Sequence, residues 1–114
     1  MELLIYKDKY GEYTYYLDED RREILHGLNR FRYKNGQLEA EWNYKDGKKH
    51  GLHRDWYQSG QLNSEYRYKD RKRHGPQRDW YADGQIMSRS FYWQGAGYGS
   101  KQEYKDFLIA NRDW

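Results

Sequence analysis

Hydrophobic and polar positions alternate along most of this chain. The clearest case is the stretch from residue 38 to 44, where Leu38, Ala40, Trp42 and Tyr44 are separated by single polar residues. A period of two is typical of a β-strand that presents its apolar side chains to one face of a sheet. The alternation therefore predicts a mainly β protein.

Turn residues separate the strand-like runs about every twelve positions. X-Gly pairs between aromatic-rich runs favour two-residue hairpin turns, because Gly, Asn and Asp tolerate positive φ. We therefore expect an antiparallel meander whose strands have about six or seven residues. The turn signals are Asn35-Gly36, Asp46-Gly47, Ser59-Gly60, Asp70-Arg71, Asp83-Gly84 and, in degenerate form, Gln94-Gly95.

These turns belong to a repeat of 24 residues, marked by a His-Gly pair at positions 26, 50 and 74. A fixed period of this length indicates a stacked-repeat protein, in which each unit packs on its neighbours. The chain is interpreted as a single repeat domain, 1–114, with a degenerate N-terminal cap (1–25), repeats at 26–49, 50–73 and 74–97, and a C-terminal helical cap (98–114).

The C-terminal cap departs from the period of two. Ser100 and Glu103 form a capping box at the start of a helix. Tyr104, Phe107 and Leu108 then share one helical face. We expect a short amphipathic helix that covers the last strand, and its alternative role is a docking helix.

A two-residue loop at Ser59-Gly60 fixes the register of the strands on either side of it. Opposite charges on facing positions stabilise a strand pair, so the pairs that this register creates provide a test. The register places Arg54 opposite Glu65, Arg30 opposite Glu41 and, against the rule of opposite charges, Arg78 opposite Arg89.

The register also sorts side chains onto two faces. The first face is the more regular, and we expect it to be the structural core, with Phe31, Tyr33, Leu38, Ala40, Trp42, Tyr44, Tyr57, Leu62, Tyr66, Tyr68, Tyr81, Ile86 and Tyr92. The second face mixes aromatic rings with charges, as binding surfaces often do. It holds Leu28, Leu52, Trp56, Trp80, Met87, Phe91 and Trp93 among arginines and glutamates.

Composition supports a thin sheet rather than a compact sphere. The 114 residues are only 36% hydrophobic but include 14 Tyr, 5 Trp and 3 Phe, so a core must be built from rings with polar tips. The absence of Cys excludes disulfides, thiolate metal sites and cysteine nucleophiles. No apolar run is long enough to span a bilayer and no signal peptide is evident, which favours a cytoplasmic protein.

The core repeated units are 44–51, Tyr-Lys-Asp-Gly-Lys-Lys-His-Gly, and 56–62, Trp-Tyr-Gln-Ser-Gly-Gln-Leu. These units resemble the MORN repeat in its bacterial variant form. The resemblance implies an elongated, twisted, single-layer antiparallel sheet of stacked hairpins. Similar bacterial proteins are described as antitoxin or immunity components, and other MORN-like proteins as scaffolds or phospholipid binders. The sequence departs from the family pattern at Arg71, where Gly is expected, and from Gly95 onward.

Two groups of residues are candidates for binding. Trp and Arg dominate interface hot spots, so the first candidate is a partner-binding row of Trp56, Trp80, Trp93, Arg54 and Arg78. The second candidate is an anion-binding edge at the turns, formed by Lys45, Lys48, Lys49, Arg71, Lys72 and Arg73. The alternatives are that the rings pack within the fold and that the turn cations are solvated and deter aggregation.

Catalysis and metal binding are not expected. His26, His50 and His74 lie on strands two apart, about 10 Å from each other, which is too far to share one ion. Asp55 and Asp79 are equivalent in consecutive repeats, which indicates a structural or surface role. We expect no enzyme, cofactor or small-molecule substrate.

The expected function is inhibition of a toxin or effector protein by occlusion. Binding of nucleic acid or anionic membrane and a self-assembling scaffold, joined edge to edge, are the alternatives.

Overall fold

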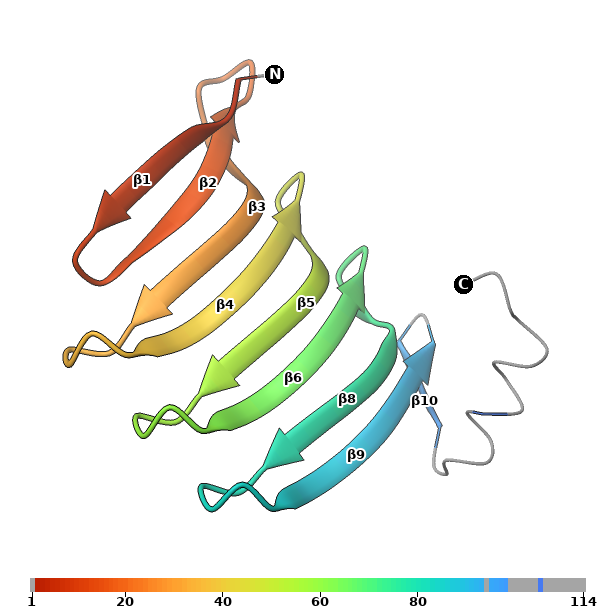
Figure 1. Ribbon diagram of the computed structural model, residues 1–114. Helices are drawn as coiled ribbons and strands as arrows, with labels where there is room; N and C mark the ends of the chain where they lie inside the picture. Colours follow the sequence, from red (N-terminus) through yellow and green to blue (C-terminus); the bar gives the residue numbers. More distant parts are fainter. Residues whose placement is uncertain (1, 94, 99–104, 106–114) are drawn as a thin grey trace.

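The computed structural model describes residues 2–93, 95–98 and 105, and its strands form one antiparallel sheet (Figure 1). The strands from β1 to β10 lie in the sheet in chain order, except that the short β7 lies off this path and, like β8, pairs with β6. The predicted mainly β meander of hairpins is therefore confirmed. The strands are β1 (Leu4–Asp8), β2 (Gly11–Leu17), β3 (Glu23–Arg32), β4 (Leu38–Lys45), β5 (Lys48–Trp56), β6 (Leu62–Lys69), β7 (Lys72–Arg73), β8 (Gly75–Trp80), β9 (Ile86–Trp93) and β10 (Ala96–Tyr98).

The sheet is a single open layer. The molecule measures 45 × 37 × 17 Å along its principal axes. The short dimension fits one sheet with its side chains, because a second packed sheet would add about 10 Å. The expected C-terminal cap at 98–114, with its helix over 100–112, lies almost wholly outside the described residues.

The repeat appears as a shift of 24 residues between equivalent strands. β4 recurs as β6 and then as β9, and β5 recurs as β7 and β8 together. The break between β7 and β8 falls at His74, whose amide still donates to the Arg67 carbonyl at 2.9 Å. The strands β3, β4 and β5 have 10, 8 and 9 residues. They are longer than predicted, because pairing continues almost to each turn.

The loop after β5 has three residues, so the prediction of a two-residue loop was wrong. The Tyr57 amide donates to the Gln61 carbonyl at 2.9 Å, and the Gly60 amide donates back to Tyr57 at 2.9 Å. Gly60 has a φ of 94°, as a three-residue hairpin with a left-handed glycine requires. A register shift beside the loop absorbs the extra residue, so Arg54 still lies opposite Glu65.

The turns at the other end of the sheet are tighter. Asp46 and Gly47 have φ values of 49° and 79°, and Asp70 and Arg71 have 49° and 72°. Two successive positive φ values are the mark of a type I′ turn. Arg71 therefore keeps the backbone conformation of the expected glycine, and the repeat geometry survives the departure in sequence.

The two faces of the sheet carry different chemistry. Residues that are paired across neighbouring strands share a face, and side chains alternate between faces along each strand. The network face carries Trp42, His53, Asp55, Ser64, Tyr66, Asp79 and Ser88. The ladder face carries Lys7, Glu12, Arg30, Glu41, Arg54, Glu65, Arg78 and Arg89.

Burial corrects the expected core. Among the described residues, Ala40 is the only buried hydrophobic residue, and Phe31, Tyr81 and Ile86 are exposed although they were assigned to the core. The described strands form a single layer, and no second layer of described residues covers exposed rings such as Phe31 and Tyr81. The buried side chains are instead small or polar ones within the strands. These are Asn29, His53, Ser64 and Gln77 on the network face, together with His74.

Candidate functional site

A row of charged side chains crosses the ladder face at right angles to the strands. Its members are paired in the order Lys7, Glu12, Arg30, Glu41, Arg54, Glu65, Arg78, Arg89. The charges alternate up to the last pair, where Arg78 faces Arg89 as the sequence predicted. Opposite charges stabilise such facing pairs by about 0.2–1 kcal/mol, and like charges destabilise them.

Glu65 links the two arginines that were predicted to bind a partner. Its carboxylate lies 2.8 Å from Arg54 Nε and 3.3 Å from Arg78 Nη2. The side chains of Arg54 and Arg78 are 37% and 47% exposed. Ion pairs with this exposure contribute about 0–1 kcal/mol to stability. Both arginines are therefore held in position while they remain accessible to a partner.

The structure places two of the three tryptophans of the predicted partner-binding row at the same end of the sheet. Trp56 ends β5 and Trp80 ends β8, each partly buried and close to a three-residue loop. The Arg78 guanidinium lies 6.0 Å from the centre of the Trp80 ring, at the limit of a cation–π contact. Trp93 ends the antiparallel strand β9, so it lies at the opposite end of the sheet, with its ring centre 4.2 Å from that of His74.

The hairpin of β8 and β9 exposes three apolar residues outside the predicted binding sites. Tyr81, Ile86 and Met87 are 51%, 39% and 48% exposed. Ile86 is paired with Trp80, so the group continues from the tryptophan. No local signal distinguished these residues, because alternation assigned Tyr81 and Ile86 to the core face.

Asp55 and Asp79 occupy equivalent positions on the network face and accept equivalent hydrogen bonds. The carboxylates therefore link neighbouring strands, in agreement with a structural role. Burial and the bond to Asp79 raise the pKa of Tyr66 to about 12. The donors are Trp42 Nε1 at 3.2 Å and Ser64 Oγ at 2.9 Å to Asp55, and Tyr66 Oη at 2.6 Å and Ser88 Oγ at 2.9 Å to Asp79.

A second repeated feature of the network face is a buried polar side chain at position 29, 53 or 77. His53 Nε2 lies 3.0 Å from the Asn43 carbonyl, and Gln77 Nε2 donates to the Arg67 carbonyl at 3.2 Å. Burial lowers the pKa of His53. The ring is therefore neutral at neutral pH, with Nε2 as the protonated nitrogen that serves this bond. The hydropathy pattern did not reveal this position, although the three aligned repeats all hold a polar residue there.

The predicted anion-binding residues lie together at one end of the sheet. We call the turn segments 45–49 and 69–73 the basic edge (Figure 1). The edge carries seven basic and two acidic side chains, a net charge of +5. Lys45 is paired with Lys48, and Lys69 with Lys72, so like charges face each other across both turns.

Two of the predicted anion-binding residues are engaged within the fold. Lys49 Nζ lies 5.2 Å from the centre of the Tyr68 ring. Arg73 donates to the Tyr92 hydroxyl at 3.2 Å and lies over the Tyr66 ring at 4.9 Å. Lys45, Lys48, Arg71 and Lys72 are exposed and are therefore the members best placed to contact an anion.

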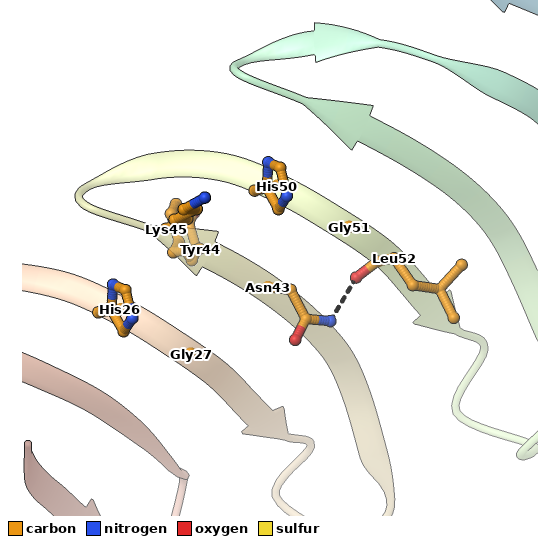
Figure 2. Close-up of a pocket in the computed structure, with 8 residues that line it drawn as sticks. All are labelled: His26, Gly27, Asn43, Tyr44, Lys45, His50, Gly51 and Leu52. Carbon is orange, nitrogen blue, oxygen red and sulfur yellow. Dashed lines mark hydrogen bonds between the residues drawn. The ribbon is translucent and has the colours of Figure 1, made fainter. Parts of the chain in front are cut away.

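Two shallow hollows recur one repeat apart beside the basic edge. Glycines of the His-Gly pairs are among the residues that line them. Figure 2 shows the first, where Asn43 donates to the Leu52 carbonyl at 2.7 Å. Its volume is about 450 Å³, with His26, Gly27, Asn43, Tyr44, Lys45, His50, Gly51 and Leu52 as its walls. The second measures about 230 Å³, between His50, Gly51, Arg67, Tyr68, Lys69 and His74.

The histidines of these hollows serve the turns. His26 Nδ1 accepts the Asp46 amide at 3.1 Å, and His50 Nδ1 accepts the Asp70 amide at 3.5 Å. Within the described part of the chain, no group of three or more His, Cys, Asp or Glu residues is arranged to hold a metal ion. His26 and His50 thus support the turns of their units.

The open sheet, its repeated hairpins and its two accessible faces define a β-repeat protein that presents an extended surface. The model of the MORN repeat variant family matches the chain three times, at residues 25–46, 49–70 and 73–94. These matches cover more than half of the sequence, and the chain belongs to this family. Repeats of this family are generally modules that bind proteins or membranes.

No curated protein and no solved structure matches the chain significantly. None of the residues that the structure describes belongs to a helix long and apolar enough to cross a membrane.

Proposed function

We propose that this protein is a non-enzymatic binding module that neutralises a toxin or another effector protein by covering its functional surface. The observation that carries the proposal is the position of Trp56 and Trp80 at one end of the ladder face, beside Arg54 and Arg78. Trp and Arg are the residue types that contribute most to interface hot spots. The sheet holds them in place before binding, which lowers the entropic cost of association.

The surroundings of the tryptophans support an interface. The exposed Tyr81, Ile86 and Met87 belong to the same β8–β9 hairpin as Trp80, and Ile86 is paired with it. Arg78 and Arg89 lie on the same hairpin, so charged side chains adjoin these apolar ones, a mixture that is common at protein interfaces. A face of 45 × 37 Å also exceeds the roughly 800 Å² that each protein contributes to a standard interface. The surface is therefore large enough to occlude a site on a partner.

We infer the nature of the partner from the resemblance to bacterial MORN variants of the antitoxin and immunity type. A surface that is formed before binding can inhibit by occlusion, that is, by covering the functional site of its partner. We accordingly propose that the protein acts in the bacterial cytoplasm, where its partner is a toxin or effector protein.

The proposal is tested by capture of partners from nuclease-treated lysate of the host organism. Wild-type protein is expected to retain one stoichiometric protein at about 0.15 M salt and also at about 0.5 M, because an apolar hot spot is insensitive to screening. Trp56→Ala combined with Trp80→Ala is expected to lose it. Tyr10→Ala, which removes an exposed ring at the far edge of the sheet, is the matched control. Retention by the double variant, with an intact fold, would contradict the proposal.

A second candidate function is supported by the charge of the basic edge. Its two neighbouring turns carry a net charge of +5, which suits a phosphate-rich polymer or an anionic membrane. Lys45→Glu, Lys48→Glu and Lys72→Glu together are then expected to abolish sedimentation with phosphatidylserine vesicles and binding to single-stranded RNA. Both interactions should fall steeply with salt. Unchanged binding in the triple variant would exclude the basic edge.

A further inference from the structure

The charge row of the ladder face ends in a mismatch. Arg78 on β8 directly faces Arg89 on β9. In the two preceding repeats the position of Arg89 is held by Glu41 and Glu65. Glu41 accepts a hydrogen bond from Arg30 at 2.9 Å, and Glu65 accepts the equivalent bond from Arg54 at 2.8 Å. The third repeat thus lacks the acidic partner that the other two supply.

Arg89 makes no ion pair with any residue that the structure describes, and its side chain is exposed. Arg78 reaches Glu65 at 3.3 Å on its other side, but Glu65 is already bonded to Arg54. Like charges that face each other across two strands are destabilising. An excess of positive charge therefore remains at the last strand pair of the row.

A hollow lies between these two arginines. Its volume is about 260 Å³, and Pro76, Gln77, Arg78, Arg89 and Phe91 line it. Pro76 is paired with Phe91, so an apolar pair adjoins the arginine pair on the same strands. Guanidinium groups bind carboxylates through parallel hydrogen bonds. The neighbouring proline and phenylalanine offer contact to the apolar part of the same ligand.

We propose that this hollow receives a carboxylate side chain of the partner protein. The partner then supplies the acid that the repeat places at Glu41 and Glu65 but not at Arg89. This inference rests on the proposed function, because the hollow lies on the ladder face with Trp56 and Trp80. Charge complementarity at such a point gives an interface its register and its specificity.

The charge of the site favours a carboxylate over a phosphate group. Two arginines contribute two positive charges, and Glu65 beside Arg78 offsets part of this charge. A single negative charge is sufficient to complete the alternation. A doubly charged phosphate would be repelled by Glu65 and is better matched by the basic edge, where the net charge is +5.

The first test uses a peptide probe. An N-acetylated hexapeptide of alternating leucine and glutamate is titrated into labelled protein, and the Nε–Hε signals of the arginines are followed by NMR. Signals of Arg78 and Arg89 are expected to shift, and the same peptide with glutamine is expected to leave them unchanged. Arg89→Glu should weaken binding at least about tenfold, the usual scale for loss of a charge-assisted anchor. Lys34→Glu, an equal charge reversal at an exposed turn position, is the matched control.

Arg89→Glu also has a readout in the free protein. It restores the alternation of charge, so its thermal midpoint is expected to equal or exceed that of the wild type. Arg89→Gln, which removes the charge without adding one, is expected to reduce peptide binding as well. Arginine shifts caused by inorganic phosphate or RNA but not by the glutamate peptide would overturn the proposal. Unaltered affinity in both Arg89 variants would also overturn it.

The second test separates this inference from the proposed function. The partner captured by wild-type protein is measured against Arg89→Glu and against the double tryptophan variant. Loss of binding in both supports both proposals. Loss in the tryptophan variant alone leaves the proposed function intact and refutes the carboxylate site. Full binding by both variants refutes the proposed surface itself.

Discussion

On the network face, Asp55 and Asp79 each accept two hydrogen bonds from side chains of the same sheet. On the ladder face, charges pair at partly exposed positions, and the row ends with Arg78 facing Arg89. The same 24-residue repeat thus builds one face whose repeated carboxylates are satisfied internally and one face whose last charge is not. This difference suggests that the first face maintains the fold and that the second is available to a partner.

The largest effect is expected when the network face is broken. Asp55→Ala leaves Trp42 Nε1 and Ser64 Oγ without their acceptor. The free energy of unfolding should fall by about 2–3 kcal/mol, because hydrogen bonds to a charged group are lost in a partly buried site. Urea denaturation followed by circular dichroism measures the loss. Asp20→Ala, at an exposed turn position, should change stability by less than about 0.5 kcal/mol. Equal effects of the two variants would show that the network is not stabilising.

A smaller effect is expected when the charge row of the ladder face is interrupted. Glu65→Gln removes the charge shared by Arg54 and Arg78. Because both arginines are partly exposed, stability should fall by no more than about 1 kcal/mol. The loss should nearly vanish in about 0.5 M salt, unlike the loss in Asp55→Ala. Unfolding curves at low and high salt make this comparison, with the exposed Glu39→Gln on β4 as control. A loss that does not respond to salt would argue against an electrostatic ladder.

The smallest effect at neutral pH is expected for a substitution within the network face. His53→Gln introduces the residue that the next repeat holds at the equivalent position, Gln77, which bonds the equivalent carbonyl. Stability at pH 7 should therefore change little. The difference appears in acid. Burial lowers the pKa of His53, so the unfolded chain takes up a proton at higher pH than the folded protein does.

For this reason the wild type should lose stability as the pH falls through about 6.5, the ordinary pKa of histidine. His53→Gln should lose less over the same range. Some loss should remain, since burial also lowers the pKa of His74. Thermal unfolding at a series of pH values from 7.5 to 5 is the measurement. Parallel curves for the two proteins would mean that His53 does not contribute to the acid sensitivity.

Local patterns in the sequence were sufficient for the strand order and most of the register. Alternation and turn residues act over a few positions, and the pairing of Arg54 with Glu65 follows from them. The loop length was not recoverable in this way. The extra loop residue at Gly60 is cancelled by a register shift beside it, so the charge pairs do not reveal it.

Two properties were predicted less well because they depend on the whole sheet: which side chains are buried, and at which end of the sheet a side chain lies. Rings such as Tyr81 read as core residues, but a single layer cannot cover them. Trp93 shares a face with Trp80 by alternation, yet the reversal of direction in β9 places it at the other end of the sheet. The charge reversal at Arg89 was visible in the sequence, whereas the hollow beside it required the structure.

The most direct test of the central claim is hydroxyl-radical footprinting of the complex with the captured partner. The proposed function predicts that Trp56, Trp80 and Met87 become protected when the partner binds, while the exposed Tyr10 remains as reactive as in the free protein. Protection confined to Tyr44 and Tyr68 beside the basic edge, with Trp56, Trp80 and Met87 unchanged, would contradict the account.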